Sequence, residues 1–551
     1  MRRWRTAIGA GLALTLAVGA AACSDDGGSA DGTEAPATSV TSADAAGALT
    51  GVTARLSNRI SIAGILEATA DQPVRLEVTA TAGDEVVEVP RTARARPEHR
   101  LPIVGLHAET TYDLAVTAFD DAGAEVGSAT AELTTGALPD WVPEIEVTTT
   151  DPERQAPGVT LFDVQRWGVA QDPDQPPGGL LALDEAGEVV WYLGNDLGAG
   201  DSRMGQDGSI WFLFAPFGFK QVDLLGNRIG SWAWGDEDDV RPGGPTIVQS
   251  PQYDLVSFHH EVAPQPDGDI VAFGRYQLDL TEAEQEAICP GDPADFGIRE
   301  DVIMEFTREG EVLHEWSMVD TIDPAEVPGR ELCSVDYADY RDWAHGNGIV
   351  LDEANNRVLV TARHIDTLYA FRYLDDESGP SGELLWSIAP NGTLPLDGEP
   401  SYGLHAPELT ADGSILVLDN GNERPVDVPY SRAVRYEVDD SSPDPADWTA
   451  RQTWEFRTED LRTGEPLFAD FLGDADELPN GNVLISFAGI GQVEPPAYGR
   501  MLEVIPTGES GGDIVWDVSL PDTYVSYRAQ RLPSLYAGPR WQTDAVIPLV
   551  S

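Results

Sequence analysis

The sequence has few positively charged residues and almost no lysine. Of its 551 residues 34 are Lys or Arg, with Lys220 the one lysine, against 94 Asp and Glu, so the formal net charge is −60. A field this negative repels phosphate backbones, which excludes nucleic acid as a partner. Cysteine is also scarce, with three residues, and this excludes a small scaffold held together by disulfides.

Long apolar runs are lacking except at the N-terminus. Three arginines in the first five residues precede the uncharged run 7–22, which ends at Cys23 and a Gly- and Asp-rich stretch. This pattern predicts a signal peptide over residues 1–22, too short to span a membrane as a mature helix. The small residues before Cys23 resemble a bacterial lipobox, so we expect lipid modification of Cys23. Cleavage near Ala22 that leaves a free thiol is the alternative.

The composition of residues 23–46 predicts a flexible, lipid-anchored tether. We therefore expect an exported cell-surface or periplasmic lipoprotein, with the membrane as a partner through its lipid anchor. In an exported protein, Cys289 and Cys333 are expected to form one structural disulfide. Closing a loop of about 44 residues stabilises the fold by about 4 kcal/mol in the chain-entropy model. No pattern in the sequence assigns an oligomeric state.

Glycine and proline are abundant, with 55 and 40 residues, which indicates many turns between short strands and an all-β fold class. Residues 47–137 alternate apolar and polar side chains, as in Val74 to Ala80 and Tyr112 to Ala118, so a small antiparallel β-sandwich is predicted there. Tyr112, six residues after Leu106, is similar to the corner tyrosine of immunoglobulin and fibronectin III domains.

Residues 144–551 contain a repeat. Each unit is a strand, a Gly-containing turn and a strand ending in tryptophan; the tryptophans are Trp191, Trp232, Trp316, Trp386, Trp454 and Trp516. Before five of the six units lies a second hairpin such as PDGDIVAFGR. Two hairpins per repeat predict six four-stranded sheets, a six-bladed β-propeller over 144–551. The first unit lacks its second hairpin, so the segment 527–536 is expected to complete it. The alternatives are two packed sheets or a seventh blade at 161–167.

Three histidines occupy similar positions before the turn of a second hairpin. The first strand of each blade lines the central channel, so these side chains should meet at one mouth of it. The return strands bring Arg275, Arg363 and Asn420 to the same mouth. Asn347, two residues after His345, faces the same way by strand alternation. The predicted cluster is His260, His345, His405, Arg275, Arg363, Asn420 and Asn347.

In so acidic a protein, a cluster of His and Arg favours an anion that arginine can hold, such as sulfate, phosphate or carboxylate. The alternative is that these are ordinary rim or core residues. His99, His107 and His314 fall outside the pattern and are expected to be structural. His259 and His364 adjoin the cluster, and strand alternation predicts that they point away from it.

Several strings resemble the bacterial arylsulfate sulfotransferase family. They are FHHEVAPQPDGDIVAF, DWAHGNGIVLDEANNRVLVTARHIDTLYAF, YGLHAPELTADGSILVLDNGNERP and YRAQRLPSLY. The layout, a small β-sandwich ahead of a six-bladed propeller, is also similar to that family. The sequence departs from the pattern at Gly473, where the register would place another histidine.

The resemblance implies transfer of a sulfuryl group between phenols through a sulfohistidine, without a nucleotide donor, metal or other cofactor. Phenols and aryl sulfates would be the partners. His405 would be the nucleophile, with Arg363, His345 and Asn347 holding sulfonate oxygens. His260 would bind oxygens or exchange a proton with the phenol. Arg275 and Asn420, placed by the register, would also face the substrate.

The aryl ring requires apolar walls, for which Trp343, Tyr369 and Tyr402 are candidates, with blade packing as their alternative role. Three other functions compete with sulfuryl transfer. They are a non-catalytic propeller that binds a ligand or surface polymer, a hydrolase with a metal on the three histidines, and a quinone-dependent dehydrogenase.

Overall fold

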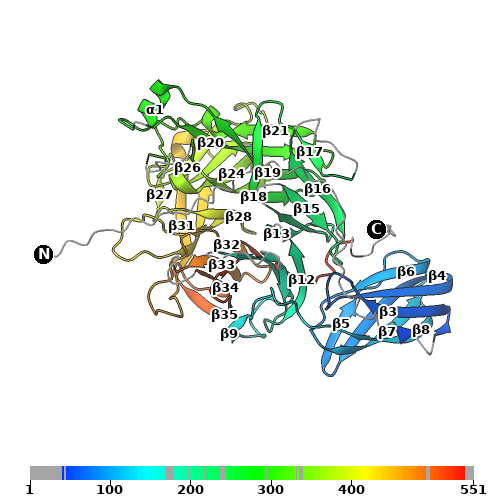
Figure 1. Ribbon diagram of the computed structural model, residues 1–551. Helices are drawn as coiled ribbons and strands as arrows, with labels where there is room; N and C mark the ends of the chain where they lie inside the picture. The colour runs from blue at the N-terminus through cyan, green and yellow to red at the C-terminus, as the bar shows by residue number, and fades with distance from the viewer. Residues whose placement is uncertain are drawn as a thin grey trace. The chain divides into compact units, whose positions relative to one another are not determined.

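The computed structural model describes residues 40–41, 45–167, 178–195, 198–214, 218–235, 243–292, 294–330, 332–333, 339–491, 497–539 and 541. Nearly all regular structure in these residues is β, as predicted (Figure 1). One α-helix, α1 (Glu282–Ile288), and four short 3₁₀ helices interrupt the strands; the latter are η2 (Met318–Asp320), η3 (Glu353–Asn355), η4 (Arg363–Ile365) and η5 (Pro445–Asp447). In the described residues no helix is both long and apolar enough to cross a membrane. The predicted signal peptide and Cys23 lie outside the described residues, as does the tether apart from residues 40–41 and 45–46.

The first eight strands form the N-terminal β-sandwich. They are β1 (Val40–Thr41), β2 (Ala46–Gly47), β3 (Leu49–Leu56), β4 (Gly64–Ala82), β5 (Glu85–Val89), β6 (Arg96–Ile103), β7 (Thr111–Phe119) and β8 (Glu125–Thr134). The long strand β4 pairs with β3 and β6 through its first half and with β5 and β7 through its second half. Because apolar side chains alternate along β4, every second residue from Val74 to Ala80 is buried. Tyr112 accepts a hydrogen bond from the backbone N–H of His107 at 2.9 Å, as expected of a corner tyrosine.

The rest of the chain forms a six-bladed propeller, as predicted. Blade 1 contains β10 (Val159–Arg166), β11 (Gly178–Leu183), β12 (Val189–Asn195), β36 (Tyr524–Val525) and β37 (Ala529–Leu532). Blade 2 contains β13 (Gly200–Met204), β14 (Ile210–Leu213), β15 (Phe219–Val222), β16 (Arg228–Trp234) and β17 (Thr246–Val248). Blade 3 contains β18 (Leu255–Pro264), β19 (Ile270–Leu278), β20 (Gly297–Phe306), β21 (Val312–Ser317) and β22 (Tyr340–Asp342).

The other three blades follow the same plan. Blade 4 contains β23 (Gly346–Asp352), β24 (Arg357–Ala362), β25 (Thr367–Arg372) and β26 (Leu384–Ile388). Blade 5 contains β28 (His405–Leu409), β29 (Ile415–Asp419), β30 (Arg432–Asp439), β31 (Thr449–Phe456) and β27 (Leu396–Asp397). Blade 6 contains β32 (Asp474–Glu477), β33 (Val483–Ile490), β34 (Tyr498–Pro506), β35 (Gly512–Ser519) and β9 (Glu146–Thr150). Neighbouring inner strands contact one another in the order β37, β13, β18, β23, β28, β32, and β33 returns to β37.

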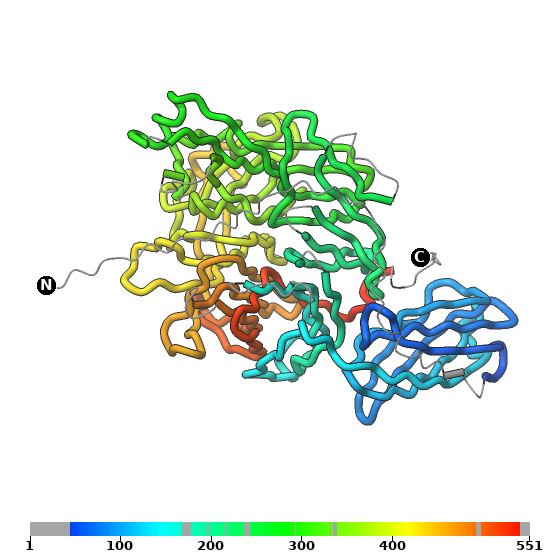
Figure 2. The backbone as a smooth tube through the Cα atoms, viewed as in Figure 1, coloured from blue at the N-terminus to red at the C-terminus, as the bar shows by residue number. Residues whose placement is uncertain are grey.

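The ring closes where the two ends of the propeller sequence meet. Strands β36 and β37 pair with β10 and supply the inner strand that blade 1 lacks, as predicted (Figure 2). The segment 161–167 therefore belongs to blade 1, through β10, and the alternative of a seventh blade there is wrong. At the other end, β9 adds to the outer edge of blade 6 by pairing with β35. Each end of the sequence thus completes a blade built mainly from the opposite end.

The six repeated tryptophans join successive blades. Each lies on the fourth strand of its blade, and five of them hydrogen-bond through Nε1 to the following blade. These bonds run from Trp191 to Leu224 O, Trp232 to Arg308 O, Trp316 to Ser381 Oγ, Trp386 to Asp440 Oδ2 and Trp454 to Gly511 O, at 2.8–2.9 Å. The ring of Trp516, in blade 6, instead lies against the guanidinium of Arg531 in β37 of blade 1. A buried indole with one donor suits this role, since it adds apolar contact and a directed bond.

The inner strands of blades 2 to 5 are irregular at the same level. Left-handed residues occur there, with φ of 44° at Asp201, 55° at His260, 55° at His345 and 50° at Ala406. Pairing with the second strand slips beside each of them, as at a β-bulge. A non-glycine residue in this region is strained by about 1–3 kcal/mol, and such strain clusters at functional sites. The bulges turn side chains away from the directions that strict alternation predicts.

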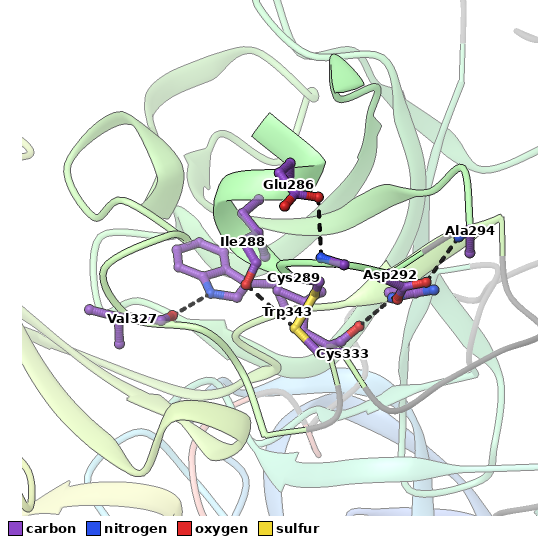
Figure 3. Close-up of a disulfide and its surroundings, with 11 residues drawn as sticks. Glu286, Ile288, Cys289, Asp292, Ala294, Val327, Cys333 and Trp343 are labelled. Carbon is purple, nitrogen blue, oxygen red and sulfur yellow. Dashed lines mark hydrogen bonds and ion pairs between the residues drawn. A yellow bond between two sulfur atoms is a disulfide. The ribbon is translucent and has the colours of Figure 1, made fainter. Parts of the chain in front are cut away.

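Cys289 and Cys333 form the predicted disulfide, at the C-terminal end of α1 (Figure 3). Cys289 is buried in the same apolar cluster as Trp343. The Trp343 indole donates from Nε1 to the carbonyl of Val327 at 2.9 Å. The bridge therefore secures the long connection between blades 3 and 4, which leads directly into His345.

Candidate active site

His405 begins the inner strand of blade 5 and is almost fully buried, with 1% of its surface exposed. Its Nδ1 lies 2.6 Å from Oδ1 of Asn420, on the return side of the same hairpin. The Asn420 amide donates from Nδ2 to the carbonyls of Ala469 and Leu472, at 2.8 and 2.9 Å. These two bonds fix which end of the amide faces His405, so Nδ1 of His405 must be the donor. In the neutral ring the lone pair is then on Nε2.

The surroundings of His405 keep its ring neutral. Burial, followed by the nearby charge of Arg363, lowers the pKa of His405 well below its ordinary value of 6.5, although the bond to Asn420 opposes this. Among the described residues no hydrogen bond to Nε2 of His405 is made. A neutral imidazole with an uncommitted lone pair is a nucleophile.

His260 lies at the bulge in the inner strand of blade 3. Its ring centroid is 4.7 Å from that of His345, and its Nδ1 is 2.9 Å from Nδ1 of His259. Burial and then His345 lower the pKa of His260 well below 6.5. The prediction that His259 points away is wrong, since its ring centroid is 5.1 Å from that of His260, while its face stacks on Phe273 at 5.4 Å; the bulge beside His260 breaks the alternation on which the prediction rested.

His345 immediately precedes the inner strand of blade 4. Its Nδ1 lies 2.7 Å from a carboxylate oxygen of Asp342 and must carry a proton that it donates there. The prediction that His364 points away is wrong, since its ring centroid is 4.5 Å from that of His345. The reason is local: residues 363–365 form the 3₁₀ helix η4, which ends at left-handed Asp366, so strand alternation does not apply.

All three histidines of the predicted cluster therefore engage a partner through Nδ1. The partner is a neutral amide for His405, another imidazole for His260 and a carboxylate for His345. The ring of Tyr527 stands almost perpendicular to two of them, with centroids 6.0 Å from His260 and 6.1 Å from His405. Tyr527 donates from its hydroxyl to the carbonyl of Asn347 at 2.6 Å. It lies in the closing segment, which the sequence marked only as a completing strand.

The two arginines of the cluster differ in their partners. Arg275 donates from Nε to Asp301 at 3.1 Å, and its Nη2 is 3.8 Å from Asp342, so nearby carboxylates balance its charge. Arg363 donates from Nη2 to the carbonyl of Asp470 at 2.9 Å and from Nη1 to Nε2 of His364 at 3.0 Å. The charge of Arg363 also acts on the Asp470 carboxyl, whose pKa it lowers against the effect of burial, and on His405, whose pKa it lowers.

The two asparagines of the cluster bind protein groups. Asn347 is fully buried; its Oδ1 accepts from Thr361 at 2.7 Å, and its Nδ2 donates to the carbonyl of Leu404 at 3.0 Å. Asn347 thus joins blade 4 to the residue before His405. Asn420, as described above, orients His405. Both side chains hold the site in shape as the structure stands.

Buried charges lie beside the histidines and join four blades. Arg528, which follows Tyr527, contacts Glu261 at 2.6 Å and Asp201 at 2.9 Å, and Arg203 contacts the same two carboxylates. Glu261 also accepts from the backbone N–H of Ile349 at 3.2 Å. Residues from blades 1 to 4 are thereby tied together under the site, which favours a rigid arrangement of the imidazoles.

One group of side chains has the composition of a metal site. A ligand atom from each of Asp342, His345 and His364 lies within 4.8 Å of the other two. This set differs from the three histidines predicted as the alternative metal ligands. Arg363 and Arg275 adjoin the group, and two cations disfavour a divalent ion there.

Of the predicted aromatic walls, Trp343 and Tyr369 are buried in the core between blades 3 and 4, so packing is their role. Tyr402 is partly exposed and lies 5.0 Å from the guanidinium of Arg424. A different aromatic pair was not predicted. Trp167, with 46% of its surface exposed, lies against Phe471 with centroids 4.9 Å apart. No periodic signal marks either residue.

Comparisons with known proteins assign most of the chain to one family. The family model described as Arylsulfotransferase (ASST) matches residues 144–528. Arylsulfate sulfotransferase AssT of Escherichia coli O6:H1 (strain CFT073) is 21% identical over 269 residues, and AssT of Lelliottia amnigena is 22% identical over the same length. Each match covers 37% of this chain and 42% of the relative.

The solved structures that resemble the chain are more distant. A putative 6-phosphogluconolactonase of Bacteroides uniformis has a TM-score of 0.32 and 11% identity, with 84% of this chain and 100% of that chain covered. That likeness is too weak to support any argument. The family match is different, because it extends over most of the sequence and includes every residue of the histidine cluster. This chain belongs to the arylsulfotransferase family.

Proposed function

We propose that the protein is an aryl sulfotransferase that moves a sulfuryl group from an aryl sulfate to a phenol through a sulfohistidine at His405. The observation that carries this proposal is the orientation of one imidazole. Asn420 binds Nδ1 of His405 and is itself fixed by two carbonyls, so the lone pair of a neutral ring is on Nε2. The curated relatives are named for this activity, but the match spans less than half of their length.

In the first half of the reaction, Nε2 of His405 attacks the sulfur of the donor. The N–S bond forms as the bond from sulfur to the aryl oxygen breaks, and the electron pair leaves with the phenolate, which takes a proton from a neighbouring imidazolium. In the second half, an acceptor phenol gives its proton to that imidazole and attacks the sulfur. The N–S bond breaks, and His405 recovers its lone pair.

Positive charge around the sulfuryl group would come chiefly from Arg363. The charge of this guanidinium lowers the pKa of His405, and the guanidinium is held by the carbonyl of Asp470 and by Nε2 of His364. It is therefore suited to hold sulfonate oxygens as charge shifts during transfer. His345 and His260, with Nδ1 engaged, would present Nε2 to the same oxygens or to the phenol. For Asn347 and Asn420 we propose roles in positioning the catalytic groups, and for Arg275 a role beside the substrate.

For the aryl ring we propose a wall formed by Trp167 and Phe471. Phe471 lies between Asp470, whose carbonyl accepts from Arg363, and Leu472, whose carbonyl accepts from Asn420. It is thus next to backbone groups that hold two residues of the site. Trp167 packs on it and remains nearly half exposed, which is unusual for so large an apolar side chain. An aromatic ring could stack there while its sulfate faces Arg363.

We also propose that the enzyme is exported and held at the membrane by lipid on Cys23, with residues 23–46 as the tether. This proposal rests on the N-terminal sequence. It would place the enzyme where phenols and aryl sulfates arrive from outside the cytoplasm. The mass of the mature N-terminal peptide, isolated from membranes, tests it; a free, unmodified Cys23 would contradict it.

The test of the reaction is a search for the covalent intermediate. The purified protein is mixed with 4-nitrophenyl sulfate, quenched and digested, and we expect one added sulfuryl group on the peptide that contains His405. His405→Ala should lose both this adduct and transfer to phenol, whereas His314→Ala, outside the site, should keep them. Transfer by His405→Ala at the wild-type rate would refute the proposal. Turnover that chelators abolish and zinc restores would instead favour a metal site at Asp342, His345 and His364.

A further inference from the structure

A buried carboxylate lies behind His260, reached through His259. Asp301 is in the middle of β20 and has no exposed surface. Its Oδ1 is 3.0 Å from Nε2 of His259 and accepts from Nε of Arg275 at 3.1 Å. Its Oδ2 accepts from the backbone N–H of Gly346 at 2.6 Å. One carboxylate thus contacts the neighbours of His260 and of His345 as well as Arg275.

Asp301 is ionised. Burial opposes the charge, but Arg275 and His259 outweigh burial and bring the pKa of Asp301 to about 2. The lone pair of an unprotonated Nε2 would repel this carboxylate, so Nε2 of His259 carries the proton. Burial, followed by Arg275, lowers the pKa of His259, which therefore holds one proton. Its Nδ1 is then an acceptor.

This assignment determines the proton on the next ring. Nδ1 of His259 is 2.9 Å from Nδ1 of His260, and two acceptors cannot face each other at that distance. Nδ1 of His260 must be the donor, so the lone pair of its neutral ring is on Nε2. His260 is thereby oriented as a base, with its accepting nitrogen on the side away from His259.

We propose that Asp301 and His259 are positioning residues that make His260 the acid and base of sulfuryl transfer. The proposal rests on the function proposed above. His260 Nε2 takes the proton of the acceptor phenol as the phenol oxygen bonds to sulfur and the N–S bond of sulfo-His405 breaks. The same proton returns to the aryl oxygen of the next donor as its bond to sulfur breaks. No other co-reactant is needed, and protons and charge balance over the cycle.

Burial and the neighbouring groups hold the pKa of His260 well below 6.5, so the relay of Asp301 and His259 acts by orienting the ring when it takes up the proton. In the imidazolium, both nitrogens of His260 are donors, and the Nδ1 proton remains bound to His259. The negative charge of Asp301 acts through that neutral ring, as the third member of a catalytic triad acts on its histidine without taking the proton. His405 has only a neutral amide behind it, which suits a nucleophile that must stay unprotonated.

His259→Phe is the informative variant. It keeps a ring to stack on Phe273 but removes both nitrogens. His314→Phe, which removes a half-buried imidazole from the outer strand of the same blade, is the control. Loss of acid–base assistance matters most when the leaving phenolate is unstable. We expect His259→Phe to slow transfer from phenyl sulfate by about 10²-fold, and from 4-nitrophenyl sulfate by less than about threefold. His259→Gln, whose amide oxygen can accept from Nδ1 of His260, should recover part of the loss.

Equal losses with the two donors, or no loss with either, would overturn the proposal. If the wild-type protein forms no sulfohistidine, the proposed function fails instead. The relay is then tested separately, by measuring which ring nitrogen of His260 carries the proton. In protein labelled with ¹⁵N-histidine, the neutral ring of His260 should carry its proton on Nδ1, and His259→Phe should shift that resonance. A proton on Nε2 of His260 in the wild type would contradict the relay directly.

Discussion

His405 and Asn420 face each other across the open end of one hairpin, and their contact sets the tautomer of the His405 ring. Both hydrogens of the Asn420 amide are held by carbonyls in the segment that leads into blade 6. The proposed nucleophile, His405 of blade 5, is thus oriented through Asn420 by backbone carbonyls that lie just before blade 6. A neutral orienting group is consistent with a ring that must attack unprotonated.

Asn420→Ala should therefore impair the first half-reaction more than substrate binding. Without the acceptor, Nδ1 of His405 loses its partner and the ring can rotate or change tautomer. We expect the rate of sulfohistidine formation to fall by about 10²-fold or more, with a change in KM of less than about threefold, because a wrong tautomer costs up to about 10⁴-fold in a comparable triad. Rapid quenching and mass measurement of the His405 peptide would give the rate.

The stability of Asn420→Ala must be measured as a control, so that a slower reaction is not caused by unfolding. The variant also loses two bonds to backbone carbonyls, at about 1 kcal/mol each, so its unfolding must be followed in parallel. A folded variant that forms the adduct at the wild-type rate would show that Asn420 does not set the reactivity of His405.

The pH dependence of the first half-reaction should differ from that of an ordinary histidine. Burial and Arg363 hold the pKa of His405 well below 6.5, so its ring stays neutral as the pH falls through that value. With 4-nitrophenyl sulfate, whose leaving group needs no proton, adduct formation should hold steady from about pH 7 to about pH 5. A rate that halves near pH 6.5 would contradict this.

Whereas adduct formation should not change as the pH falls, the stability of the fold should decrease. Burial and then His345 lower the pKa of His364 to about 3, and His260 and His405 are also depressed. Below 6.5 the unfolded chain takes up protons at these residues and the native state does not, so the free energy of unfolding falls as the pH drops from 6.5 toward 3. Thermal unfolding across that range, compared with His364→Gln, measures the effect, which should be smaller in the variant.

The propeller could be predicted from the sequence because its signals are local and repeated. Each tryptophan marks the fourth strand of a blade, and each Gly or Asn turn marks an inner hairpin. The missing hairpin of the first unit also predicted the closing strands β36 and β37 correctly. The repeat is informative because each blade packs on its neighbours in the same way, so similar residues recur at equivalent positions.

The contacts behind the three histidines could not be predicted in the same way. Asp301 stands in the third strand of blade 3, where no turn or periodicity distinguishes it from other polar residues. His364 reaches His345 because η4 replaces a strand, and His260 and His345 adopt left-handed φ angles. These depend on packing between blades, which period-two alternation does not describe.

Removal of the Trp167 side chain should weaken recognition of the aryl group while leaving the chemistry intact. If Trp167 stacks on the substrate ring, Trp167→Ala should raise KM for aryl sulfates about fivefold to thirtyfold, as expected for loss of an aromatic contact of about 1–2 kcal/mol. The value of kcat should change by less than about twofold. Steady-state kinetics with a series of phenyl and naphthyl sulfates would measure this.

A matched comparison for Trp167→Ala is Trp167→Phe, which keeps an aromatic face. It should recover most of the lost affinity, especially for the larger ring. If both variants bind every donor as the wild type does, the exposed indole contacts only Phe471 and the aryl ring stacks elsewhere.

Loss of the disulfide should lower stability without altering the site directly. Cys289 and Cys333 are 44 residues apart in the sequence, and closing such a loop is worth about 4 kcal/mol in the chain-entropy model, as an upper value. The double variant Cys289→Ala, Cys333→Ala should unfold at lower denaturant concentration than the wild type. Its kcat at low temperature should remain within about twofold, since Trp343 keeps its own bond to Val327 next to His345. Wild-type protein treated with a reductant should unfold like the double variant; if the oxidised, reduced and substituted proteins unfold together, the bridge does not stabilise the connection between blades 3 and 4.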